Sequence, residues 1–117
     1  MHIEVQRIYE NHDHLEGTRI LVDRLWPRGI SKVEARLDSW WKELAPSTEL
    51  RKWFHQKDDN WSDFKVRYFT ELDSKKSLIA EKLKDLDLRK TLILLYGAKD
   101  TDHNQAVLLK EYLEDNF

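Results

Sequence analysis

The stretch TLILLYGA, residues 91–98, decides the fold. Four consecutive apolar residues, Leu92 to Leu95, are typical of a short strand that is buried on both faces. A second run of this kind, Ile20 to Val22, lies within a strand expected over residues 19–25. Strands buried on both faces occupy the middle of a sheet that helices cover, so both runs predict central strands.

The rest of the chain supplies an edge strand and several helices. Residues 3–8 alternate apolar and polar side chains, which is typical of a strand with one buried face and predicts an edge position. Apolar spacing predicts helices around residues 37–44, after Pro46 from an N-cap at Ser47, over residues 61–86 from an N-cap at Asn60 with a break at 73–74, and shortly after Asp100.

This order of elements predicts an α/β fold. The expected architecture is a single domain over residues 1–117, with a small, mostly parallel sheet of about three strands flanked by helices in Rossmann-like layers. The long helical segment between the second and third strands is the crossover that a parallel pair requires. The orientation of the first strand stays open, because its nine-residue connection suits either direction.

Composition excludes several classes of function. The chain has no cysteine, which excludes disulfides, thiolate catalysis and cysteine-ligated metals. Lys+Arg 20 against Asp+Glu 22 gives a net charge of -2, so bulk attraction to nucleic acid or membranes is not expected. No apolar membrane span or signal peptide is visible, which predicts a cytoplasmic protein. No glycine-rich phosphate loop occurs, no cofactor is predicted, and HDH at residues 12–14 is a poor metal site.

The chemistry gathers after the two central strands. If these strands are parallel neighbours, their carboxyl ends lie at one edge of the sheet, where open α/β sheets bind ligands. DRLWPRG follows one strand and YGAKDTDHN contains the end of the other. The candidate residues at this edge are Asp23, Arg24, Trp26, Arg28, Lys99, Asp100, His103 and Asn104.

Four segments, LVDRLWPRG, APSTELRKWF, RYFTEL and LLYGAKDTDHNQAVLLKEYL, resemble the domain of unknown function 488 family in its YeaO-like branch. The resemblance spans nearly the whole chain and implies an α/β fold with a site at the two strand ends. It matches Asp23, Arg24, Pro27 and Arg28 to the first family motif and Lys99, Asp100, His103 and Asn104 to the second. Asn104 stands where the wider family carries cysteine, so no thiol-dependent activity of relatives transfers to this chain.

Three functions fit these residues. In the first, an anionic small molecule, phosphate-bearing or nucleotide-like, is held by arginine and a helix end, with acid/base catalysis by a nearby carboxylate or imidazole. Its ligand-binding residues are Arg24, Trp26, Arg28, Lys99 and Asn104, and its catalytic residues are Asp23, Asp100 and His103. In the second, a non-catalytic module binds protein or nucleic acid through its arginine and tryptophan side chains. In the third, the cluster only forms structural ion pairs.

Several residues keep two interpretations. Trp26 either stacks on a ligand or packs in the core. Asp100 either joins the site or is the N-cap of a helix beginning at Thr101. His103 is either a general base or a structural side chain, and the sequence does not distinguish the two.

Overall fold

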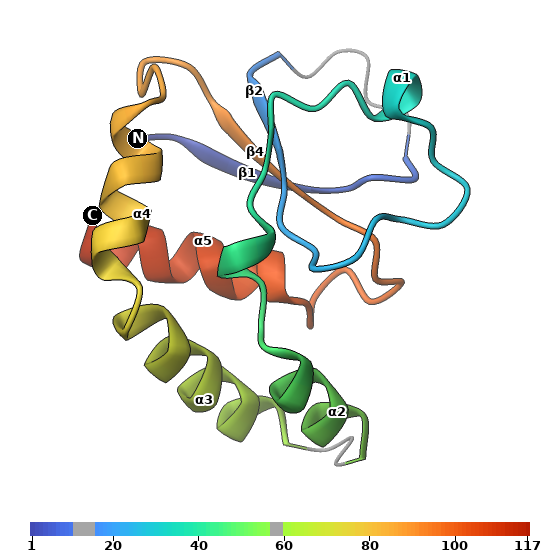
Figure 1. Ribbon diagram of the computed structural model, residues 1–117, viewed down its shortest axis with the longest axis vertical. Coiled ribbons are helices and arrows are strands. Elements are labelled where there is room, and N and C mark those ends of the chain that lie inside the picture. Colours follow the sequence, from blue (N-terminus) through green and yellow to red (C-terminus); the bar gives the residue numbers. More distant parts are fainter. Residues whose placement is uncertain (11–15, 57–59) are drawn as a thin grey trace. The chain divides into compact units, whose positions relative to one another are not determined.

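The computed structural model describes residues 1–10, 16–56 and 60–117 (Figure 1). The chain forms two compact units. The first unit comprises Met1–Ala45 and Asp87–Phe117, and the second comprises Pro46–Leu86. Among the described helices, none combines the length and the apolar character needed to cross a membrane.

The first unit is built on a parallel sheet, which confirms the predicted α/β fold. Its four strands are β1 (Ile3–Arg7), β2 (Thr18–Leu21), β3 (Ser39–Trp40) and β4 (Leu92–Tyr96), in the order β1-β4-β2-β3. All five residues of β4 are buried, as the continuous apolar run predicts for a central strand. The predicted edge position of β1 is also confirmed, and its open orientation is now known: β1 runs parallel to β4.

The register places three strand ends at one edge of the sheet. β4 pairs with β1 up to Tyr96, opposite Arg7, and with β2 up to Leu95, opposite Leu21. Because all these pairs are parallel, the chain leaves β1, β2 and β4 at the same edge. We call the last residues of β1 and β4, Arg7 and Tyr96, together with residues 8–10, 22–28 and 97–104, which follow the strand ends, the strand-end rim.

Each face of the sheet has its own cover. On one face a core cluster includes Leu21, Ile93 and Leu95, packed beside residues of the segment that carries α1 (Lys32–Ala35). Helix α5 (Gln105–Asn116) contacts β1 and β4 (Figure 1). Since side chains alternate along a strand, Leu94 and Tyr96 point away from the α1 cluster.

The helix predicted around residues 37–44 is wrong. Residues 39–40 form β3, and only Lys42–Leu44 form a short 3-10 helix. The free edge of β2 captures this segment, because Asp38 N–H donates to the Arg19 carbonyl and Trp41 N–H donates to the Leu21 carbonyl, each at 2.8 Å. Pairing with an exposed strand edge therefore overrides the helical spacing of the apolar residues, and the sheet gains a strand that was not predicted.

One polar residue of β1 is buried, although the alternating pattern predicts that it is exposed. Gln6 was expected on the solvent-facing side with Glu4, yet only 5% of its surface is exposed. Its Oε1 accepts a long, 3.5 Å hydrogen bond from the Arg19 guanidinium, and its Nε2 has no partner among the described residues. The polar side of this edge strand is therefore partly covered.

The second unit is helical. It contains α2 (Thr48–Gln56), α3 (Trp61–Asp73) and α4 (Lys76–Lys84), so the predicted break near residues 73–74 is confirmed. The predicted cap at Ser47 is confirmed as well, because its hydroxyl oxygen accepts the Leu50 N–H at 3.1 Å. The same hydroxyl donates to Glu71 of α3 at 2.6 Å. Asn60 does precede α3, but its side chain makes no capping hydrogen bond, so that detail of the prediction is wrong.

Candidate functional site

Asp23 joins the ends of β2 and β4 across the strand-end rim. The predicted strand over residues 19–25 stops at Leu21, so Asp23 lies in the loop beyond it. Its Oδ2 accepts the Gly97 N–H at 2.9 Å, and its Oδ1 accepts from the side-chain amide of Gln105. Both carboxylate oxygens therefore bind donors of this chain, and both donors come from the segment around the end of β4 and the start of α5.

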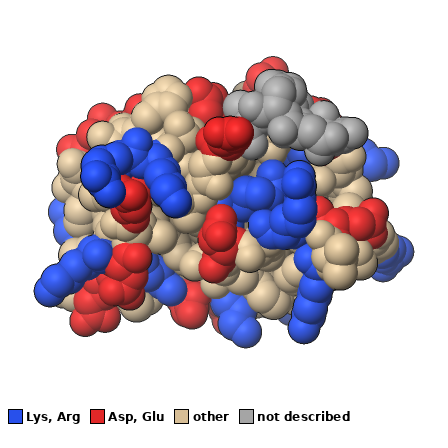
Figure 2. Space-filling view, turned by 90° about the horizontal axis from the view of Figure 1, so that it is seen from above, with Lys and Arg blue, Asp and Glu red and all other residues tan. Residues whose placement is uncertain are grey.

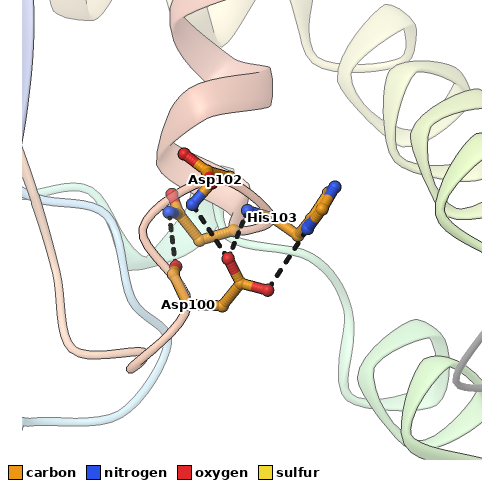
Figure 3. A network of polar contacts seen from close by, with 4 residues as sticks. Asp100, Asp102 and His103 are labelled. Carbon is orange, nitrogen blue, oxygen red and sulfur yellow. Dashed lines mark hydrogen bonds and ion pairs between the residues drawn. The ribbon is translucent and has the colours of Figure 1, made fainter.

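Asp100 and His103 form a small exposed network just before α5 (Figure 3). Asp100 Oδ1 accepts the backbone N–H groups of Asp102 and His103 at 2.9 and 3.0 Å, and Oδ2 lies 3.2 Å from His103 Nδ1. These hydrogen bonds, the backbone ones first, lower the pKa of Asp100. The carboxylate is thus stabilised in its charged form at the surface.

The N-cap of the last helix is Asn104, not Asp100. Helix α5 begins at Gln105 rather than at Thr101, and Asn104 Oδ1 accepts the Val107 N–H at 3.1 Å. Only 3% of the Asn104 surface is exposed, and its Nδ2 donates to the Asp100 carbonyl at 3.0 Å. Both ends of this amide are therefore used inside the protein.

Arg24 and Trp26 each donate a hydrogen bond to a backbone carbonyl of the first unit. Arg24 Nη2 donates to the Ala45 carbonyl at 3.2 Å. The Trp26 indole N–H donates to the Ile30 carbonyl at 2.6 Å, and its ring meets Trp40 edge-on with centroids 5.5 Å apart. Trp26 is half-buried against the apolar cluster, a placement that favours its core interpretation.

Arg28 and Lys99 are exposed on the rim. The Arg28 carbonyl accepts the Tyr9 hydroxyl at 2.8 Å, which fixes its backbone. Neither the Arg28 guanidinium nor the Lys99 ammonium forms a hydrogen bond or ion pair with the described part of the chain. Their donors face solvent.

Three further rim residues were not predicted from the sequence: Arg7, Tyr9 and Tyr96. Arg7 Nε donates to the Ala98 carbonyl at 2.9 Å, and its guanidinium lies 4.7 Å from the centre of the Tyr9 ring. Tyr96 ends β4 with 3% of its surface exposed. Arg7 and Tyr9 could have been predicted if the orientation of β1 had been known, because only a parallel β1 ends at this edge of the sheet.

The roles assigned to the candidate residues stay predictions. In residues 1–10, 16–56 and 60–117, no group of three or more histidine, aspartate or glutamate side chains is arranged to hold a metal ion. His2 lies within that part and pairs with Glu4 at 2.8 Å. The HDH segment, residues 12–14, lies outside the described residues.

Comparison with known proteins agrees with the sequence motifs. Residues 2–117 match the family model described as the inactive DUF488-N3 subclade. The chain is 43% identical over 113 residues to the uncharacterized protein YeaO of Escherichia coli (strain K12), covering 97% of each chain.

More distant relatives come from mycobacteria. The chain is 35% identical over 111 residues to the uncharacterized proteins Mb3100c of Mycobacterium bovis and Rv3073c of Mycobacterium tuberculosis, covering 95% of this chain and 92% of each relative. No solved structure matches the chain significantly. With a family model matched from residue 2 to residue 117 and YeaO so similar along its length, this chain belongs to the DUF488 family, in its YeaO-like branch.

Proposed function

We propose that this protein is a non-catalytic domain that binds a small oxyanion, such as a phosphate-bearing molecule, at its strand-end rim. The observation that carries the proposal is a difference among four charged side chains of the rim, Asp23, Asp100, Arg28 and Lys99. The carboxylates of Asp23 and Asp100 accept hydrogen bonds from this chain, whereas the charged groups of Arg28 and Lys99 have no partner among the described residues.

Cationic groups without a partner, beside carboxylates that already accept hydrogen bonds, favour anion binding. An arginine offers several N–H donors in one plane, which suits carboxylate and phosphate oxygens. The Tyr9 hydroxyl holds the backbone of Arg28 in place, so the long side chain starts from a fixed point. Arg28 is therefore the first residue to test.

The same contacts favour structural roles for two of the predicted catalytic residues, Asp23 and Asp100. A carboxylate whose oxygens accept hydrogen bonds is stabilised in its charged form, which makes it a weaker general base. Both oxygens of Asp23 accept hydrogen bonds from this chain, and both oxygens of Asp100 have partners as well. The chain has no cysteine, and the subclade that it matches is described as inactive.

Nucleic-acid binding, the alternative interaction, is less well supported. Binding to duplex DNA depends mainly on a basic surface that neutralises phosphates. The net charge is -2, and Figure 2 shows acidic and basic side chains interspersed on the face that it displays. A small ligand needs only the local cations of the rim.

The experiment is a titration of the ¹⁵N-labelled protein with inorganic phosphate at low ionic strength. In the wild type, we expect the amide signals of residues 97–104 and of Arg28 to shift. R28A should weaken binding at least fivefold, because it removes a charge-assisted hydrogen bond. The control is R89A: Arg89 is an exposed arginine that pairs with Asp87 and precedes β4, at the opposite end of that strand.

Two results would contradict the proposal. One is a wild-type protein whose rim signals do not move with phosphate, or move equally in R28A and R89A. The other is hydrolysis of p-nitrophenyl phosphate that D23N or H103A abolishes, because turnover lost with a rim residue would make the site catalytic.

A further inference from the structure

We propose that Tyr96 and Arg7 bind the same oxyanion, with the Tyr96 hydroxyl donating a hydrogen bond to one of its oxygens. This inference rests on the proposed function. It adds a fixed neutral donor to the exposed cations of the rim, and it requires a ligand with an unprotonated oxygen.

The sheet register places the two residues side by side. Tyr96 is the last residue of β4 and Arg7 is the last residue of β1, and the two are opposite each other in the parallel ladder. Neighbouring strands lie about 4.8 Å apart and paired side chains point to the same face. Both side chains therefore leave the same face of the sheet at its ligand-binding edge.

The Tyr96 hydroxyl has an unused donor. Only 3% of the residue's surface is exposed, so its position is fixed by packing. Buried tyrosines usually hydrogen-bond through their hydroxyl, yet that of Tyr96 has no partner among the described residues. The only fully buried side-chain polar atom without a partner in this part of the chain is Gln6 Nε2. The Tyr96 hydroxyl therefore reaches the surface, where a ligand oxygen can accept a hydrogen bond from it.

Arg7 is held in place and still has donors to offer. Its Nε donates to the Ala98 carbonyl, and its guanidinium lies over the Tyr9 ring, so the group is oriented from two sides. Its two terminal nitrogens form no hydrogen bond with the described residues. A pre-oriented guanidinium loses less conformational entropy on binding than a mobile lysine does.

Burial, and then the carboxylates around it, keep Tyr96 a hydrogen-bond donor. Burial raises the pKa of the phenol, as do the nearby carboxylates of Glu10, Asp100 and Asp102, while Arg7 lowers it. The phenol therefore stays protonated at neutral pH. The same carboxylates repel an anion, so we expect weak binding of inorganic phosphate, on the order of millimolar.

The test uses Y96F, which removes one oxygen and keeps the ring. We expect the phosphate Kd to rise about tenfold, the effect of losing one hydrogen bond to a charged group. R7Q, which removes the charge of Arg7, should weaken binding at least as much. The control is Y112F, because Tyr112 is another buried tyrosine of the first unit, on α5, and we expect its phosphate Kd to be unchanged.

A second measurement uses the wild type and tests the inference even if Y96F does not fold. In protein labelled with ¹³C at the tyrosine Cζ, the Tyr96 signal of the wild type should shift on addition of phosphate. If R28A weakens binding while Y96F binds like the wild type and the Tyr96 signal stays still, the inference is wrong and the proposed function stands. If phosphate shifts no rim signal of the wild type, both are wrong.

Discussion

Asp23 and Gly97 are 74 residues apart in the sequence, and a 2.9 Å hydrogen bond from the Gly97 N–H to the Asp23 carboxylate joins them. The bond fastens the loop after β2 to the loop after β4. The other carboxylate oxygen accepts from Gln105, so one side chain holds two strand ends and the first residue of α5 together.

This arrangement predicts that D23A destabilises the protein. The change leaves the Gly97 N–H and the Gln105 amide without their acceptor, and such losses cost about 1–3 kcal/mol each where the donor stays buried. Urea unfolding should show a free energy of unfolding lower by at least about 1 kcal/mol. D115A, an exposed change near the end of α5, should stay within about 0.5 kcal/mol of the wild type. Equal stability of D23A and the wild type would contradict the structural role of Asp23.

A methyl group at position 97 should cost less stability when Asp23 is absent. A Cβ at position 97 would lie 3.0 Å from Asp23 Oδ2, which is too close for an undisturbed hydrogen bond, while its other contacts are ordinary. G97A should therefore cost about 1 kcal/mol or more in the wild type and less in the D23A background. A double-mutant cycle in urea measures this coupling. Additive costs would show that the two residues act independently.

Substitutions at residues 104 and 100 should differ, because Asn104 and not Asp100 caps α5. N104A removes the acceptor for the Val107 N–H and should lower the free energy of unfolding by about 0.5–2 kcal/mol. N104D keeps that acceptor and should lose less. D100A affects only an exposed network, so its thermal midpoint at neutral pH should lie closer to the wild type than that of N104A. The reverse order would restore the capping role predicted for Asp100.

Asp100 should also contribute a pH dependence. Its pKa in the folded protein lies below the ordinary value of 3.8, so the folded state favours the charged form. The stabilisation is fully present above that ordinary value and is lost as the pH falls through the lower pKa of the folded state. Thermal midpoints measured from neutral pH to pH 2 should fall less steeply at the acidic end in D100N than in the wild type. Parallel curves would contradict the predicted effect.

Asp102 should oppose anion binding. Its carboxylate is exposed and is among the groups that raise the pKa of Tyr96, so its negative charge acts near the proposed site. D102N should lower the phosphate Kd about two- to fivefold, the size of one exposed charge interaction, and added salt should reduce the difference. D115N is the matched control. A D102N protein that binds phosphate more weakly would mean that Asp102 contributes to the site.

The sequence predicts the centre of this fold well and its margins poorly. The continuous run at Leu92–Leu95 is typical of deep burial. The long helical segment before it supplies the crossover that a parallel pair requires, and a parallel pair has both strand ends at one edge of the sheet. β3 was missed because two residues carry too little periodicity to outweigh the helical spacing of neighbouring tryptophans.

The sequence predicts where the candidate site lies better than it predicts the contacts of its residues. Asp100 and Asn104 both belong to residue types that cap helices, and only the start of α5 decides between them. Tyr96 ends an apolar run, so its pattern indicates burial and reveals nothing of an unused hydroxyl. Arg7 depends on the direction of β1, which a loop of intermediate length leaves open.

The central position of β4 has a consequence for how the protein forms during synthesis. β1 and β2 do not pair with each other, and each pairs with β4, which lies near the carboxyl end of the chain. A nascent chain that has reached the end of α4 already carries β1 and β2 but lacks β4, the strand that pairs with both. Until β4 emerges from the ribosome, the edges of β1 and β2 that pair with it are exposed, and unpaired strand edges are prone to aggregation.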